Sequence, residues 1–145
     1  MRYWDSSALI PLLVREGTSD TLRALYEDDP LNIVWWAASV ECASAIARRE
    51  RDGSLPLALA TEALRRLAAL ERTWFEVAPA APLRASAQRL LRVHPLRAAD
   101  ALQLAAALAV GTEAPTMAMV CLDRRLREAA QREGIPLAGP EPPLP

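Results

Sequence analysis

Residues 97–108 read RAADALQLAAAL, a pattern that predicts a buried helix with one acid, Asp100, near its front. The rest of this segment is almost wholly apolar. A carboxylate in such surroundings carries a desolvation penalty that needs a nearby partner. The function of the chain therefore depends on what Asp100 faces.

Strands and helices are expected to alternate along the chain. The predicted strands cover residues 1–5, 32–36, 74–77 and 117–122, with a short edge strand at 135–137; the predicted helices cover 8–14, 18–28, 39–49, 54–71, 83–93, a segment opened by residue 97, and 124–133. Pro11 is expected in the first turn of its helix, Ser6 and Ser7 as caps before it, and Ser39 as a helix cap. Most of the strands are almost continuously apolar, which is typical of a parallel sheet covered on both faces. The sequence therefore predicts an α/β fold with a mostly parallel sheet.

The chain has the size and composition of one ordinary domain. Its 145 residues are enough for a core, and we expect a domain over 1–138 followed by a proline-rich, extended and unfolded tail over 139–145. Apolar residues make up 52% but never form a membrane-spanning run, and no secretory signal is apparent, so we expect a cytoplasmic protein without membrane contact. Cys42 and Cys121 are expected to be buried and reduced.

All 17 basic residues are arginine, and the formal net charge is −1. The absence of lysine excludes a Walker-type phosphate loop and Schiff-base catalysis. Arginine is suited to bidentate contact with phosphate, so the composition permits an RNA partner, although a general compositional bias would give the same pattern.

Four acids are expected at one edge of the sheet: Asp5, Glu41, Asp100 and Asp123. Asp5 and Asp123 each close a strand, while Glu41 and Asp100 lie just inside the helices that follow. In parallel sheets, ligands bind beyond the carboxyl ends of the strands, where these helices begin. The alternative is that the acids only cap helices or stabilise their first turns.

A cluster of carboxylates would take up protons or bind cations, because the charges repel one another. A site made only of oxygens suits Mg²⁺ or Mn²⁺ rather than zinc. Such clusters are typical of enzymes that hydrolyse phosphodiesters. The four acids together therefore favour a metal-dependent nuclease.

Four segments carry a family resemblance: YWDSSAL at 3–9, SVE at 39–41 followed by Ala45, Arg48 and Arg49, LRAADALQLA at 96–105, and LDRRL at 122–126. In this order and spacing, and over nearly the full chain, they resemble the motifs of the PIN-domain ribonucleases, especially the VapC toxins of bacterial and archaeal toxin–antitoxin pairs. The resemblance implies a three-layer α/β/α sandwich, Mg²⁺- or Mn²⁺-dependent endoribonuclease activity on RNA, a homodimer, and inhibition by a cognate antitoxin.

The resemblance also implies roles for individual residues. Asp5, Glu41, Asp100 and Asp123 are similar to the family's catalytic, metal-binding acids. The family commonly has Thr or Ser two positions before the last acid, where this chain has Cys121, a poorer hydrogen-bond donor. This departure puts in doubt any support to Asp123 from position 121.

Several side chains near the acidic edge are candidates for contact with substrate. Ser7 offers a hydroxyl close to Asp5, and Arg48, Arg49 and Arg97 are expected to contact RNA phosphates, with a solvated helix face or salt bridges as the alternative.

Other features have predictions of their own. Residues 9–14, with Leu22 and Leu25, are expected to present apolar surface to an antitoxin or a second subunit. Trp35 and Trp36 are expected to face opposite ways, and His94 is expected in a connecting loop.

Two alternatives to a toxin remain. One is a PIN-fold RNA-processing nuclease without an antitoxin. The other is a metal-dependent binding module, suggested by Asp5-Ser6-Ser7 at a strand end but weakened because Leu9 stands where such modules have a further serine.

Overall fold

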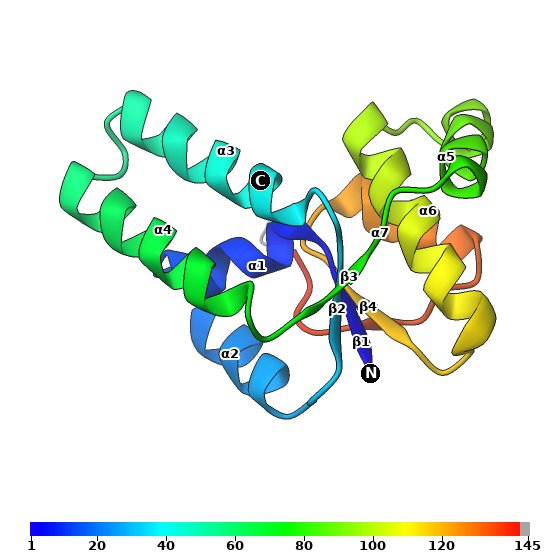
Figure 1. The fold of residues 1–145 in the computed structure, drawn as a ribbon, viewed down its shortest axis with the longest axis horizontal. Coiled ribbons are helices and arrows are strands. Elements are labelled where there is room, and N and C mark those ends of the chain that lie inside the picture. The colour runs from blue at the N-terminus through cyan, green and yellow to red at the C-terminus, as the bar shows by residue number, and fades with distance from the viewer. Residues whose placement is uncertain (143–145) are drawn as a thin grey trace.

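A five-stranded parallel sheet forms the centre of the computed structural model, which describes residues 1–142 (Figure 1). The strand order is β3-β2-β1-β4-β5, with β1 (Arg2–Trp4) in the middle. The other strands are β2 (Asn32–Trp35), β3 (Phe75–Val77), β4 (Ala118–Val120) and β5 (Leu137–Ala138). Every neighbouring pair is parallel. The predicted α/β class is confirmed, and all five carboxyl ends share one edge.

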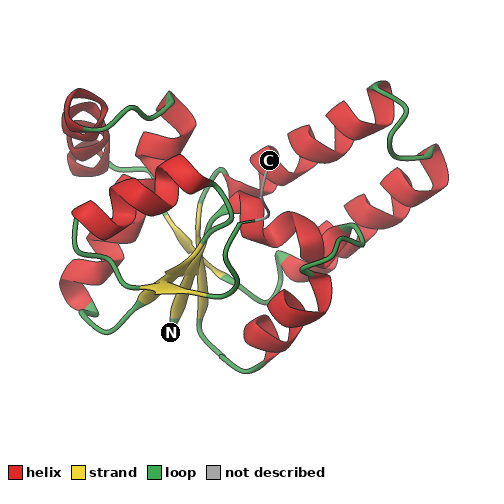
Figure 2. Cartoon of the chain, turned by 180° about the vertical axis from the view of Figure 1, so that it is seen from behind, coloured by secondary structure: helices red, strands yellow, loops and turns green. Residues whose placement is uncertain are grey.

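Helices cover both faces of this sheet. One face carries α1 (Ser6–Leu13), α2 (Ser19–Glu27), α3 (Ala38–Arg51) and α4 (Leu57–Leu70), and the other carries α5 (Ala81–Val93), α6 (Ala98–Glu113) and α7 (Arg124–Arg132). Seen from behind, the strands lie between the two groups of helices (Figure 2). Helices α3 and α4 form a long hairpin that projects from the sheet (Figures 1 and 2). The arrangement is the predicted three-layer α/β/α sandwich.

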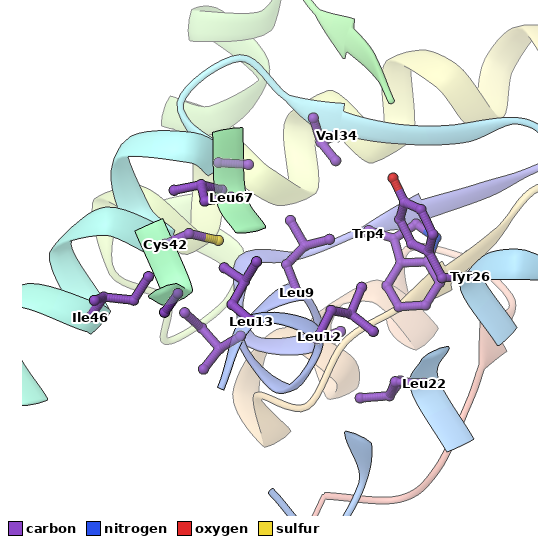
Figure 3. Close-up of a cluster of buried hydrophobic side chains, with 14 of the residues drawn as sticks. Trp4, Leu9, Leu12, Leu13, Leu22, Tyr26, Val34, Cys42, Ile46 and Leu67 are labelled. Atoms are coloured by element: carbon purple, nitrogen blue, oxygen red, sulfur yellow. The ribbon is translucent and has the colours of Figure 1, made fainter. Parts of the chain in front are cut away.

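Alternation along β1 creates two cores. Trp4 belongs to the core on the α1–α4 side, which also contains Leu9, Leu13 and Ile46 (Figure 3). Tyr3 faces the opposite way and belongs to the α5–α7 core. Successive strand residues point to opposite faces, so neighbours in β1 anchor different layers. Both β1 side chains are fully buried.

The apolar run of α1 is covered within the chain. Leu9, Ile10, Leu12 and Leu13 are at most 8% exposed because α2, α3 and α4 pack around α1. Of the residues predicted to present apolar surface to a partner, 9–13 and Leu22 are therefore buried within the chain, whereas Val14 and Leu25 are only partly buried and a partner contact there stays a prediction. Larger exposed apolar side chains lie elsewhere, among them Trp36, Val40, Leu57, Leu59, Leu64 and Phe75.

Two predicted caps differ in the structure. Asp5, not Ser6 or Ser7, is the N-cap of α1, so the helix begins earlier and Pro11 lies in its interior instead of its first turn. Asp5 takes this position because its carboxylate accepts from the backbone N–H of Ser7. Ser39 lies inside α3, where its hydroxyl donates to Oε1 of Glu71.

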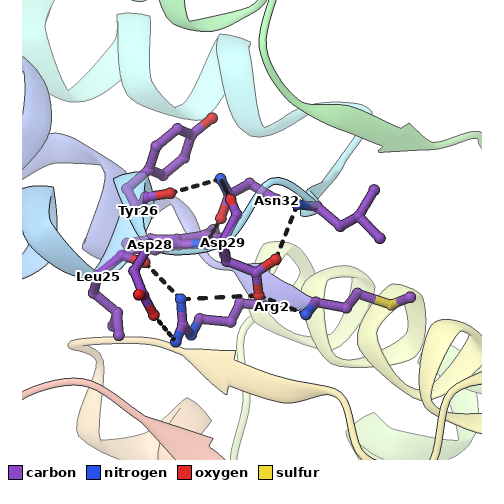
Figure 4. Close-up of polar contacts among 9 residues, drawn as sticks. Arg2, Leu25, Tyr26, Asp28, Asp29 and Asn32 are labelled. Atoms are coloured by element: carbon purple, nitrogen blue, oxygen red, sulfur yellow. Dashed lines mark hydrogen bonds and ion pairs between the residues drawn. The ribbon is translucent and has the colours of Figure 1, made fainter.

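The amino end of the sheet is held by its own polar cluster (Figure 4). The amino group of Met1 forms an ion pair with Asp29, and Arg2 bonds to Asp28. Asn32 donates its side-chain amide to backbone carbonyls of Tyr26 and Asp29, and it accepts from the indole of Trp4. These acids have structural partners and lie away from the carboxyl edge.

The tryptophan and histidine predictions had different outcomes. Trp35 is 4% exposed and Trp36 54%, but Trp36 lies in the turn after β2, and the two ring centroids are 6.4 Å apart in an edge-on contact, so the prediction of opposite strand faces is not confirmed. His94 ends α5 as its C-cap, but it is buried, and its Nε2 lies 2.7 Å from Oε1 of Glu133. Glu133 is the C-cap of α7, so this bond joins the ends of α5 and α7.

Over residues 1–142, no helix is long and apolar enough to cross a bilayer. Part of the predicted tail, residues 143–145, lies outside the described residues. In the described part, the buried Arg127 bonds to the carbonyl of Pro140 and the carboxylate of Glu141. The boundary at residue 138 stays a prediction.

Candidate metal and active site

Asp5, Glu41, Asp100 and Asp123 line one groove at the carboxyl edge of the sheet, with a volume of about 570 Å³. Asp5 follows β1, Glu41 is in the first turn of α3, Asp100 is in the first turn of α6, and Asp123 is the N-cap of α7. The structure therefore brings together the four acids that the sequence placed at this edge.

Asp5 is the most buried of the four, at 4% exposed. Its Oδ2 accepts from the backbone N–H of Ser7 at 2.9 Å and from the Ser7 hydroxyl. The thiol of Cys121 lies 3.5 Å from the same oxygen. Burial raises the pKa of Asp5 to about 6; the bonds from Ser7 oppose this shift, and the charge of Glu41 adds to it.

Glu41 is held from the opposite layer. Its Oε2 accepts from Nε2 of Gln103 at 2.8 Å. Burial is the main cause that raises the pKa of Glu41, and the nearby charge of Asp100 adds to the rise, while bonds from Gln103 and Ser6 oppose it. Repulsion from Asp100 therefore contributes to the raised pKa of Glu41.

Asp100 and Asp123 each accept a bond from their own helix start. Oδ2 of Asp100 accepts from the backbone N–H of Arg97 at 3.1 Å, and Oδ1 of Asp123 accepts from that of Leu126 at 2.9 Å. Burial raises the pKa of Asp100, as does the charge of Asp123, whereas the bond from Arg97 lowers it. Repulsion from a neighbouring acid therefore adds to the raised pKa of Asp5, of Glu41 and of Asp100.

The capping interpretation also describes real contacts. Asp5 and Asp123 are N-caps whose side chains accept backbone bonds. As the side chains stand in residues 1–142, no three His, Cys, Asp or Glu groups converge closely enough to hold one metal ion. Ion binding would require the carboxylates to come closer together than they stand in this structure. The donor set itself, four carboxylates and a hydroxyl, fits a hard cation such as Mg²⁺.

The predicted substrate contacts divide between two adjoining grooves. Ser7, Arg48 and Arg49 line the acidic groove, where Arg49 also pairs with Glu16. Arg97 lines a neighbouring groove of about 400 Å³, together with Arg124, Arg125, Leu122 and the acids Asp100 and Asp123. Basic side chains therefore stand on both sides of the acids.

No family model matches the sequence. Ribonuclease VapC49 of Mycobacterium tuberculosis is 34% identical over 143 residues, covering 94% of this chain and 93% of that protein. Ribonuclease VapC35 of the same organism is also 34% identical over 143 residues, covering 97% of both chains. The chain belongs to the VapC ribonuclease family.

Solved structures share the VapC fold of this chain. Mycobacterium tuberculosis VapC20, a toxin that cleaves the sarcin–ricin loop, superposes with a TM-score of 0.69 at 16% identity, over 97% of this chain and 100% of VapC20. A toxin–antitoxin complex from Klebsiella pneumoniae contains a chain with a TM-score of 0.61 at 15% identity, over 85% of this chain and 87% of that one. At these identities the comparison establishes a common fold.

Two residues at the VapC acidic edge were not predicted to contribute. Gln103 is 1% exposed and contacts Glu41, and Tyr3 in turn contacts Gln103. A signal was present: an amide in an apolar helix lies three residues after Asp100, on the same helical face. The partner across the fold, 100 residues away in sequence, could not be found from spacing alone.

Proposed function

We propose that this VapC-family protein is a Mg²⁺-dependent endoribonuclease, with Mn²⁺ as a substitute ion. We assign metal binding and catalysis to Asp5, Glu41, Asp100 and Asp123. The observation that carries the proposal is the convergence of these acids on one groove, in a chain 34% identical to named ribonucleases over nearly its full length.

The chemistry needs a cation because four carboxylates repel both one another and a phosphodiester. When bound, Mg²⁺ would neutralise charge at the scissile phosphate and lower the pKa of the attacking water. The four carboxylates would hold the ion, and the bonds from Ser7 and Gln103 would keep Asp5 and Glu41 in place. Arg48 and Arg97 are exposed, so their guanidinium groups would be accessible to RNA phosphates on either side of the four acids.

The cellular role we propose is that of the toxin of a toxin–antitoxin pair, acting in the cytoplasm as a homodimer. The support is family membership, together with the fold shared with a toxin–antitoxin complex. Growth arrest on induced expression, relieved by co-expression of a small protein encoded beside this gene, is the expected result. Expression without any effect on growth would favour an RNA-processing nuclease instead.

Activity is tested by incubating purified protein with single-stranded RNA in EDTA, Mg²⁺ or Mn²⁺. Asp100→Asn is compared with Glu113→Gln, a matched neutralisation at the exposed far end of the same helix. We expect cleavage only with metal, a loss of at least about 100-fold in Asp100→Asn, and wild-type rates in Glu113→Gln. Equal cleavage by Asp100→Asn and the wild type would overturn the assignment.

A further inference from the structure

Tyr3, Gln103 and Glu41 form a continuous hydrogen-bonded chain across the molecule. The hydroxyl of Tyr3 donates to Oε1 of Gln103 at 2.8 Å, and Nε2 of Gln103 donates to Oε2 of Glu41 at 2.8 Å. Tyr3 is fully buried and Gln103 is 1% exposed, while Glu41 reaches the groove. The series of hydrogen bonds therefore leads from the core to the acidic groove.

The direction of these bonds is determined by chemistry. An ionised carboxylate only accepts hydrogen bonds, so the NH₂ of Gln103 must face Glu41. Its carbonyl oxygen must then face Tyr3, whose hydroxyl has to donate. A flipped amide would set oxygen against oxygen at Glu41 and would lose that bond. Glu41 thus selects the orientation of the amide, and Tyr3 holds the amide in place by donating to its carbonyl oxygen.

The three residues come from three elements that also carry or adjoin the proposed metal-binding acids. Tyr3 lies in β1, two residues before Asp5, and Gln103 lies in α6, three residues after Asp100. Glu41 is in α3, in the opposite layer. The chain of bonds therefore ties Glu41 to the strand and the helix that position two other acids.

A packing role alone does not explain an amide at position 103. The surrounding helix is built from Ala and Leu, and an apolar side chain there would avoid the desolvation penalty of an amide. Both ends of the amide instead have specific partners, one of which reaches the groove. Removing a hydrogen bond that orients a metal ligand commonly lowers the affinity of the site for the metal.

We infer that Tyr3 and Gln103 are positioning residues that orient Glu41 for binding a divalent cation. This inference rests on the proposed function for the identity of the site. Gln103 acts directly on Glu41, and Tyr3 acts through Gln103. Neither residue touches substrate in this account.

The test measures Mn²⁺ affinity by calorimetry in wild type, Gln103→Leu and Tyr3→Phe. Tyr26→Phe is the matched control, since it removes a hydroxyl bonded to Thr73 in the same fold but away from the groove. We expect affinity to fall on the order of 10- to 100-fold in Gln103→Leu and by a smaller factor in Tyr3→Phe. Tyr26→Phe should bind Mn²⁺ as the wild type does, even if it melts at a lower temperature.

A metal-free measurement separates this inference from the proposed function. NMR order parameters of the Gln103 side-chain amide should be high in the wild type and lower in Tyr3→Phe, but unchanged in Tyr26→Phe. If Gln103→Leu does not fold, Tyr3→Phe carries the test, because it removes a single oxygen atom.

Three results have defined meanings. Wild-type Mn²⁺ affinity in both Gln103→Leu and Tyr3→Phe overturns the inference, since the bonds would then serve stability alone. Unchanged amide order in Tyr3→Phe also overturns it. Absence of Mn²⁺ binding by the wild type overturns the proposed function, whereas the amide measurement still decides whether Tyr3 orients Gln103.

Discussion

Ser7 directs two hydrogen bonds, from its backbone N–H and its hydroxyl, to the same oxygen Oδ2 of Asp5. The hydroxyl oxygen of Ser7 also accepts from the backbone N–H of Leu122, one residue before Asp123. Ser7 therefore links the ends of β1 and β4 while it holds one face of the Asp5 carboxylate. Its bonds leave Oδ1 of Asp5 for other ligands.

Replacing Asp5 by Asn should stabilise the metal-free protein. The folded pKa of Asp5, about 6, lies above the ordinary value of 3.8, so the folded state binds the proton more tightly than the unfolded state. The stabilisation that the folded protein gains from the proton on Asp5 is fully present below about pH 3.8 and is lost as the pH rises through 6. At pH 7.5 in EDTA, Asp5→Asn should gain about 1–3 kcal/mol, or roughly 3–10 °C in melting temperature.

The control for this prediction is Asp52→Asn. Asp52 is fully exposed, and bonds from Ser54 lower its pKa, so neutralisation should not stabilise the protein. Melting curves between pH 4 and 8 should show a weaker pH dependence in Asp5→Asn than in the wild type. A melting temperature in Asp5→Asn at or below that of the wild type at pH 7.5 would show that burial of the Asp5 charge is not destabilising.

Replacing Arg97 by Ala should weaken RNA binding without abolishing cleavage. Arg97 is exposed in the groove that it lines with Arg124 and Arg125 beside Asp100, where its guanidinium group would contact a phosphate. Loss of one phosphate contact should raise KM, leave kcat nearly unchanged, and reduce the slope of log affinity against log salt by about 1. Arg84→Ala, an exposed arginine on α5, should leave both quantities unchanged. Equal salt slopes in Arg97→Ala and the wild type would remove Arg97 from the RNA path.

Replacing Arg127 by Ala should destabilise the fold far more than neutralising its carboxylate partner. The Arg127 side chain is 8% exposed and donates to the carbonyl of Cys121 at 2.9 Å as well as to Glu141. Urea denaturation should show a loss of about 2–3 kcal/mol in Arg127→Ala, because a buried carbonyl loses its donor. Glu141→Gln should cost no more than about 1 kcal/mol, since Glu141 is 85% exposed. Similar losses in the two variants would contradict this division.

Local patterns were sufficient to predict the order of the elements. Apolar runs such as 117–122 marked buried strands, and the helix containing Asp100 was evident from its Ala and Leu content. Parallel strands have their carboxyl ends at one edge of the sheet. The positions of the four acids in the sequence therefore predicted that they lie together.

Contacts that depend on tertiary packing could not be predicted. The cap of α1 is different, because Asp5 and Ser7 are two residues apart and the alternative that the acids cap helices already covered this contact. The Tyr3–Gln103 bond joins residues that no local pattern relates. Burial of residues 9–13 was missed for the same reason, because α3 and α4 cover α1 only in the folded chain.

A crystal structure grown with Mn²⁺ would show directly whether the four acids bind a divalent cation together. Anomalous scattering should show Mn²⁺ in the acidic groove, ligated by oxygens of Asp5 and at least one of Glu41, Asp100 and Asp123. An acidic groove without anomalous signal at millimolar Mn²⁺ would show that the four acids do not bind the ion together.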